Sequence, residues 1–118
     1  MKLKKILINV FICVGLLAAV QAEAAEFWRT GNITRVLTDR FYGGCMINLS
    51  VFIENGCPIA GWVSLDCEDK YSPPGTGNRM YAMALTAFSL NKRVSVLVNN
   101  TEKHNGYCVA RRVDMLSD

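Results

Sequence analysis

Two runs of alternating side chains, separated by a turn signal, restrict the fold of this chain most strongly. In residues 45–53 and again in residues 61–67, apolar and polar side chains alternate, as in a β-strand with one buried face. Asn55-Gly56 lies between the runs and suits a tight turn, so the pattern predicts a hairpin that sets Cys45 opposite Cys67. The same register pairs Ile47 with Leu65, Leu49 with Val63 and Asn48 with Ser64. A slip of one residue would place apolar side chains opposite polar ones.

Four cysteines follow residue 24, and the hairpin predicts how they pair. Opposed cysteines on neighbouring antiparallel strands lie within disulfide distance, so we expect a Cys45–Cys67 bond. Cys57 at the hairpin tip is then left for Cys108. A chain this small usually needs such covalent support, and disulfides persist in oxidising compartments.

The N-terminal segment is typical of a secretory signal peptide. Three lysines within the first five residues precede an apolar run over residues 6–20, and Ala22-Glu23-Ala24 fits the cleavage rule. We therefore expect a cleaved signal peptide, residues 1–24, and one domain, residues 25–118, that is secreted or periplasmic. Without the signal peptide, thirteen basic and ten acidic residues become ten and nine, which gives no electrostatic reason to bind nucleic acid. No later run is long enough to insert into a membrane.

The remaining patterns predict three further strands and one helix. Residues 33–38, 94–98 and 107–115 are rich in β-branched or alternating apolar residues, and residues 79–90 carry apolar residues at helical spacing. Asn78 and Asn91 suit the two caps of this helix. The order is three strands, a helix and two strands, which makes the chain mainly β with one helix and favours an OB-fold-like five-stranded barrel. An open antiparallel sheet with a helix on one face is the alternative.

Residues with catalytic chemistry are few. His104 is the single histidine and is expected at the surface of a polar loop, away from any ligand set for a metal. Asp66, Glu68 and Asp69 could serve as glycosidase carboxylates, but they also suit a solvated strand exit, which we favour. We expect no catalytic residue, no metal and no cofactor, and a secreted hydrolase would require His104 to approach a carboxylate in space.

A more informative pattern is an aromatic ring among short polar side chains. Trp62 is predicted on the polar face of its strand with Asn48, Ser50 and Ser64, a mixture that suits a sugar. The alternative is that Trp62 packs under a neighbouring subunit or the helix.

The predicted helix is apolar on more than one face. Tyr81, Leu85 and Phe88 are expected to cover the barrel, whereas Met80, Met83 and Ala87 form a second apolar stripe. The second stripe predicts self-association through the helix and the edge strands.

The chain resembles the pentamer-forming B subunits of the subtilase cytotoxin and of pertussis-like bacterial toxins. The resemblance rests on Glu26-Phe27-Trp28 with Thr30-Gly31, on Cys45 and Cys67 in the second and third strands, and on the spacing from Ala84-Leu85 in the helix to Val94-x-Val96. It implies a non-enzymatic OB-fold subunit in a ring of five that binds cell-surface glycans or glycoproteins and can carry a catalytic A subunit. By the same resemblance, Ser50 matches a glycan-contacting position and Thr30 is a looser counterpart of another. The fourth strand lacks the tyrosine that contacts glycan in that family.

Two functions from different classes remain open at this stage. The first is a secreted glycan-binding module that forms a homo-oligomeric ring. The second is a monomeric periplasmic domain of the same fold that interacts with or inhibits another protein.

Overall fold

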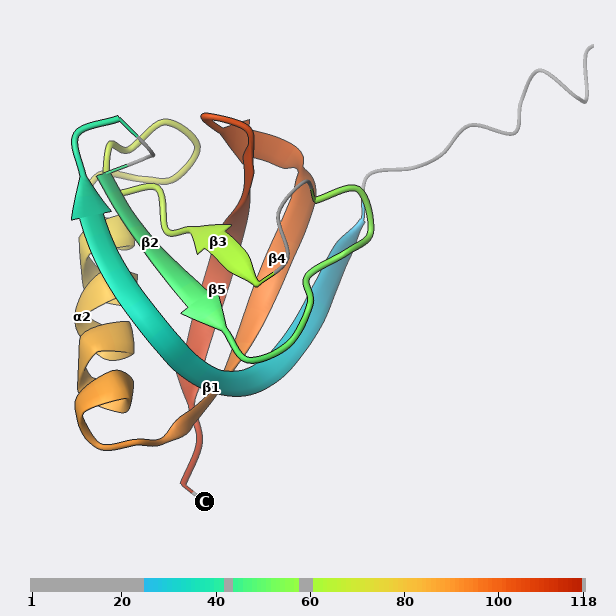
Figure 1. Ribbon diagram of the computed structural model, residues 1–118. Coiled ribbons are helices and arrows are strands. Elements are labelled where there is room, and N and C mark those ends of the chain that lie inside the picture. The colour runs from blue at the N-terminus through green and yellow to red at the C-terminus, as the bar shows by residue number, and fades with distance from the viewer. Residues whose placement is uncertain (1–24, 42–43, 58–60, 118) are drawn as a thin grey trace, which may run out of the picture.

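Five strands and one helix account for the regular structure of the part of the chain that the structure describes. The computed structural model describes residues 25–41, 44–57 and 61–117, so the predicted signal peptide lies outside the described residues. The strands are β1 (Glu26–Asp39), β2 (Gly44–Leu49), β3 (Trp62–Ser64), β4 (Arg93–His104) and β5 (Tyr107–Met115), and helix α2 (Thr76–Ser89) follows β3. The predicted order of three strands, a helix and two strands is confirmed (Figure 1).

The sheet closes on itself because β1 is long enough to pair with two neighbours. Its first half, Glu26 to Asn32, pairs with β4, and its second half, Ile33 to Asp39, pairs with β2. The strand order around the ring is β1-β2-β3-β5-β4, with β3 and β5 parallel and the other neighbours antiparallel. The alternative of an open antiparallel sheet is therefore wrong, and none of the described strands is an edge strand along its whole length. In Figure 1, β1 sweeps around the sheet and α2 stands along one side.

The hairpin of β2 and β3 forms, but its register differs by two residues from the prediction. Met46 pairs with Ser64 and Asn48 with Trp62, so the strands end at a wider loop that the Leu49 N–H closes by donating to the Gly61 carbonyl at 2.7 Å. A shift of two residues keeps each side chain on its face of the sheet. Strand β2 ends at Leu49, so residues 50–53 belong to this loop and not to the predicted strand; within it, Arg29 Nε donates to Phe52 O at 3.2 Å and to Ile53 O at 3.1 Å.

Both predicted disulfides are present. Cys45 is bonded to Cys67 and Cys57 to Cys108, each with a Cα–Cα distance of 5.6 Å. Cys67 lies beyond the end of β3, where Asp66 turns the chain with φ of 55°. The two bonds thus tie both ends of the short β3 region to neighbouring strands.

Helix α2 covers the core with its small residues. Its buried positions are Gly77, Met80, Ala84 and Ala87, whereas Met83 is 39% exposed. The predicted second stripe is therefore wrong for Met80 and Ala87, which face the sheet. The prediction that Tyr81, Leu85 and Phe88 cover the barrel fails for Leu85 and Phe88, which are 38% and 42% exposed, while Tyr81 packs against the core.

The helix begins three residues earlier than predicted and ends one residue earlier, at Ser89. It starts at Thr76, after Gly75 with φ of 83°, so Asn78 lies in the first turn and is not the cap. At the other end Asn91 has φ of 52°; its N–H donates to Phe88 O, and the N–H of Lys92 donates to Ala87 O. This pair of bonds is a Schellman motif with Asn91 in the left-handed position.

Candidate functional site

The outer surface of the sheet is hollowed beside the end of β2. The hollow has a volume of about 200 Å³ and is lined by Asn48, Leu49, Ser50, Val51, Phe52 and Gly61. Two of these residues, Asn48 and Ser50, were predicted to bind a sugar. Phe52 adds an aromatic ring that is 67% exposed.

The polar side chains of the hollow are held by strand β1. Asn48 Oδ1 accepts a hydrogen bond of 2.8 Å from Thr34 Oγ1, and Ser50 Oγ accepts one of 3.0 Å from the N–H of Asn32. Each side chain is thereby oriented before any ligand arrives, which lowers the entropic cost of binding. The hydroxyl of Ser50 acts as an acceptor in its bond and keeps its own hydrogen to donate.

Trp62 lies next to the hollow, on the strand position opposite Asn48. It is half-buried, and the guanidinium carbon of Arg35 lies 5.7 Å from the centroid of its ring. Alternation alone would send Arg35 inward with Ile33, but the register of β1 shifts between these residues, and Arg35 is exposed. The sequence pattern did not reveal this β-bulge, so it could not predict that Arg35 lies beside Trp62 on the outer surface.

Two other predicted sugar contacts lie elsewhere. Thr30 is on the outer surface, two residues before Asn32, where its Oγ1 is 2.6 Å from Ser95 Oγ on β4. Ser64 is fully buried and its Oγ accepts the N–H of Asp66 at 3.2 Å, so the prediction that Ser64 binds a ligand at the surface is wrong. Its strand partner Met46 and the neighbouring pair of Ile47 and Val63 are buried too, so this part of β2 and β3 is covered on both faces.

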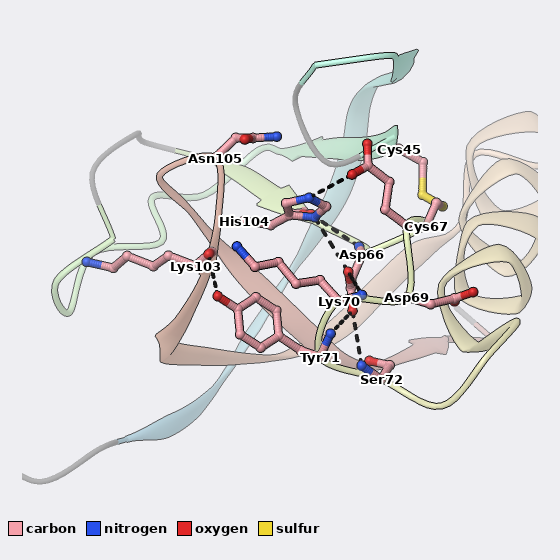
Figure 2. A network of polar contacts seen from close by, with 12 residues as sticks. Cys45, Asp66, Cys67, Asp69, Lys70, Tyr71, Ser72, Lys103, His104 and Asn105 are labelled. Atoms are coloured by element: carbon pink, nitrogen blue, oxygen red, sulfur yellow. Dashed lines mark hydrogen bonds and ion pairs between the residues drawn. A yellow bond between two sulfur atoms is a disulfide. The ribbon is translucent and has the colours of Figure 1, made fainter.

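A second polar group surrounds His104 (Figure 2). His104 is only 3% exposed, which makes the predicted surface position wrong. Its Nε2 is 3.2 Å from Glu68 Oε2, and its Nδ1 is 3.5 Å from Asp66 Oδ1. The sequence could not show this approach, because 36 and 38 residues separate the partners along the chain.

Asp66 organises the segment after β3 and is not a solvated strand exit. Its Oδ1 accepts the N–H of Lys70 at 2.8 Å, and its Oδ2 accepts those of Tyr71 at 2.7 Å and Ser72 at 3.1 Å. Asp66 is fully buried, whereas the side chain of Glu68 is 48% exposed. Both Asp66 oxygens accept hydrogen bonds from backbone N–H groups, so this carboxylate stabilises the conformation of the loop. His104 does approach Asp66, as a hydrolase would require.

Within the described ranges 25–41, 44–57 and 61–117, no helix is long and apolar enough to cross a membrane, and no group of three or more His, Cys, Asp or Glu residues could hold a metal ion.

No family model, no curated protein and no solved structure matches the chain. Function therefore has to be inferred from the residues of the site itself.

Proposed function

We propose that the hollow at Ser50 binds a carbohydrate, and that the protein is a secreted, non-enzymatic binding module. The observation that carries this proposal is the position of Asn48 and Ser50 in a hollow with the exposed ring of Phe52 on its wall and Trp62 beside it. A sugar presents an apolar C–H face and a rim of hydroxyl groups, and it needs both kinds of partner at once.

The chemistry of the two sides of a sugar is matched by different residues. The rings of Phe52 and Trp62 offer flat apolar surfaces, and Asn48 and Ser50 offer short polar groups fixed by β1. Arg35 beside Trp62 adds a cation that would donate hydrogen bonds to an acidic substituent. Cell-surface glycans and glycoproteins supply such ligands, in line with the resemblance to toxin B subunits.

The fold and assembly of this module follow from the same resemblance. A closed five-stranded sheet with its helix between β3 and β4 fits an OB-fold barrel. In α2 the single charged residue is Arg79, while Met83, Leu85 and Phe88 are exposed. An apolar, nearly uncharged outer face suits a contact with further copies of the chain, and we propose a ring of five that can carry a catalytic A subunit.

Secretion is supported by the two disulfides. Such bonds are typical of oxidising compartments, the periplasm and the cell exterior among them. Together with the signal-peptide pattern, they support a secreted or periplasmic location.

A glycan array on the oxidised protein tests the binding proposal. We expect a defined set of glycans to be retained, and we expect Phe52→Ala and Trp62→Ala each to weaken that binding at least about tenfold, or 1.4 kcal/mol. Phe41→Ala is the matched control, because Phe41 is 65% exposed but lies on the turn after β1 and does not line the hollow.

Two results would contradict the proposal. One is an array with no retained glycan. The other is a loss of binding that is as large in the Phe41 variant as in the Phe52 variant. A monomeric protein that retains no glycan would favour the alternative, a periplasmic domain that interacts with another protein.

A further inference from the structure

The buried ring of His104 has a carboxylate oxygen near each of its nitrogens. Glu68 Oε2 lies 3.2 Å from Nε2 and Asp66 Oδ1 lies 3.5 Å from Nδ1. The side chain of His104 is 4% exposed and that of Asp66 is not exposed at all. Figure 2 shows the ring enclosed between the β4–β5 hairpin and the segment after β3.

This arrangement suits the protonated ring better than the neutral one. Ionised carboxylates only accept hydrogen bonds, and a neutral imidazole has a single N–H. One ring nitrogen would then present a lone pair to a carboxylate oxygen, in a place that water hardly reaches. The imidazolium ion carries an N–H on both nitrogens and compensates part of the buried negative charge. Nδ1, which makes no hydrogen bond in the described structure, is the nitrogen whose proton decides between the two cases.

The contact joins two elements that are far apart in sequence. Asp66 binds the backbone N–H groups of Lys70, Tyr71 and Ser72, and Tyr71 in turn donates its hydroxyl to the carbonyl of Lys103, next to His104. A change at the ring therefore acts on the whole segment from residue 66 to residue 72.

Several charged or titratable groups lie on the elements around the ring. They are Asp66, Glu68, Asp69, Lys70 and Tyr71 on the segment after β3, Lys103 on β4, Tyr107 on β5, and Asp39 and Arg40 at the end of β1. Asp66 and Glu68 are the two that lie within ion-pair distance of the ring. Lys70 is placed over the ring of Tyr71, at 5.3 Å from its centroid.

We propose that His104, Asp66 and Glu68 form a pH-sensitive latch that is closed in acid. When the ring is protonated, it binds both carboxylates and fixes residues 66–72 to the β4–β5 hairpin. As pH rises and the proton leaves, this contribution is lost and the segment opens locally. The paired β1–β4 region lies outside the latch and remains folded. This device does not depend on carbohydrate binding, so either proposal can fail alone.

The protonation state of the ring can be read directly, because the chain has a single histidine. In the oxidised protein at pH 5.5, we expect the two ring ¹⁵N signals to have the similar shifts of an imidazolium ion. At pH 8.5 we expect the widely separated shifts of a neutral ring. A ring that is already neutral at pH 5.5 would overturn the proposal, since a neutral ring cannot donate to both carboxylates.

Hydrogen exchange tests the latch itself. After correction for the intrinsic pH dependence of exchange, we expect protection of the Lys70, Tyr71 and Ser72 amides to fall about tenfold between pH 5.5 and pH 8, which is the scale of one hydrogen bond to a charged group. Amides in the β1–β4 pairing, such as that of Val96, serve as the internal control and should keep their protection.

Two variants separate the latch from general destabilisation. In His104→Gln the pH-dependent loss of protection should disappear, and in Glu68→Gln it should shrink. Glu68→Gln is expected to fold, because the Glu68 side chain is half exposed, so it keeps the test decisive if the His104 variant does not fold. A tenfold fall that persists in Glu68→Gln, or that extends to Val96, would overturn the proposal.

Discussion

Replacing Gly77 with alanine should destabilise the protein, although helix propensity alone predicts the opposite. Gly77 lies in the first turn of α2 and is buried against the chain that follows β3. A Cβ at this position would lie 2.4 Å from the carbonyl oxygen of Asp66 and 2.5 Å from that of Leu65. Ordinary contacts between carbon and a carbonyl oxygen are about 3.3 Å or more, so the helix and this segment would have to separate by close to 1 Å.

The balance of two effects sets the magnitude. Alanine in place of glycine contributes at most about 1 kcal/mol to a helix, and less in its first turn. Overpacking costs about 1–3 kcal/mol. The upper part of this range applies because the atoms met are backbone atoms of a segment that the Asp66 hydrogen bonds and the Cys67 disulfide hold in place. The free energy of unfolding should therefore fall by about 1–2 kcal/mol.

Equilibrium urea unfolding of the oxidised protein measures this change. Asn78→Ala is the matched control, because Asn78 is the next residue of the same turn and is exposed; it should leave stability unchanged or raise it slightly. A Gly77→Ala protein that is as stable as the parent, or more stable, would show that the close approach of α2 to residues 65–66 does not restrict the fold.

Three further predictions concern the loop, the helix and a disulfide. Arg29→Ala frees the carbonyls of Phe52 and its neighbour, so it should weaken glycan binding about tenfold at a cost of about 1–2 kcal/mol in stability; unchanged binding in a glycan titration would contradict it. Met83→Glu should convert the assembly to folded monomers in analytical ultracentrifugation, whereas a parent protein that is itself monomeric would contradict the ring. Removing the Cys57–Cys108 bond should cost about 2–4 kcal/mol in urea unfolding. Because it spans 51 residues against 22 for the other disulfide, its loss should exceed that of the other by about 0.7 kcal/mol.

The strands could be predicted because their signal is local. Alternation places Ile47 and Val63 on the buried face whatever the distant contacts are, and both are buried. The register depended on more than alternation. The loop between β2 and β3 is held by Arg29, more than twenty residues earlier in the chain, and no pattern within the hairpin carries that information.

The buried face of the helix was ambiguous for a different reason. Two sets of apolar residues, one with Met80 and Ala87 and one with Leu85 and Phe88, both have helical spacing. The choice between them depends on how closely the helix approaches the sheet, and only small side chains permit the approach seen at Gly77. The sequence shows the helical spacing of the apolar residues, but it does not show how closely the helix packs against the sheet and the segment after β3.

The candidate site was predicted in part. Asn48, Ser50 and Trp62 meet on one surface because they share a strand face or its end. The surroundings of His104 could not be anticipated, because they form only when the segment after β3 folds back over the β4–β5 hairpin.

Closure of the sheet limits how other chains can bind to this protein. Each of the five described strands has two partner strands in the ring, so none of them is an edge strand along its whole length to which a partner peptide could add. The shortest strand pairing in the ring is that of β3 with β5, which consists of one Cα pair, Ser64 with Val109. Both disulfides flank this point, one joining Cys57 to Cys108 on β5 and the other joining Cys67 to Cys45 on β2. If the β3–β5 pairing opened, the edges of both strands would be exposed to other copies of the chain. By holding the two strands near each other, the disulfides oppose this route to aggregation.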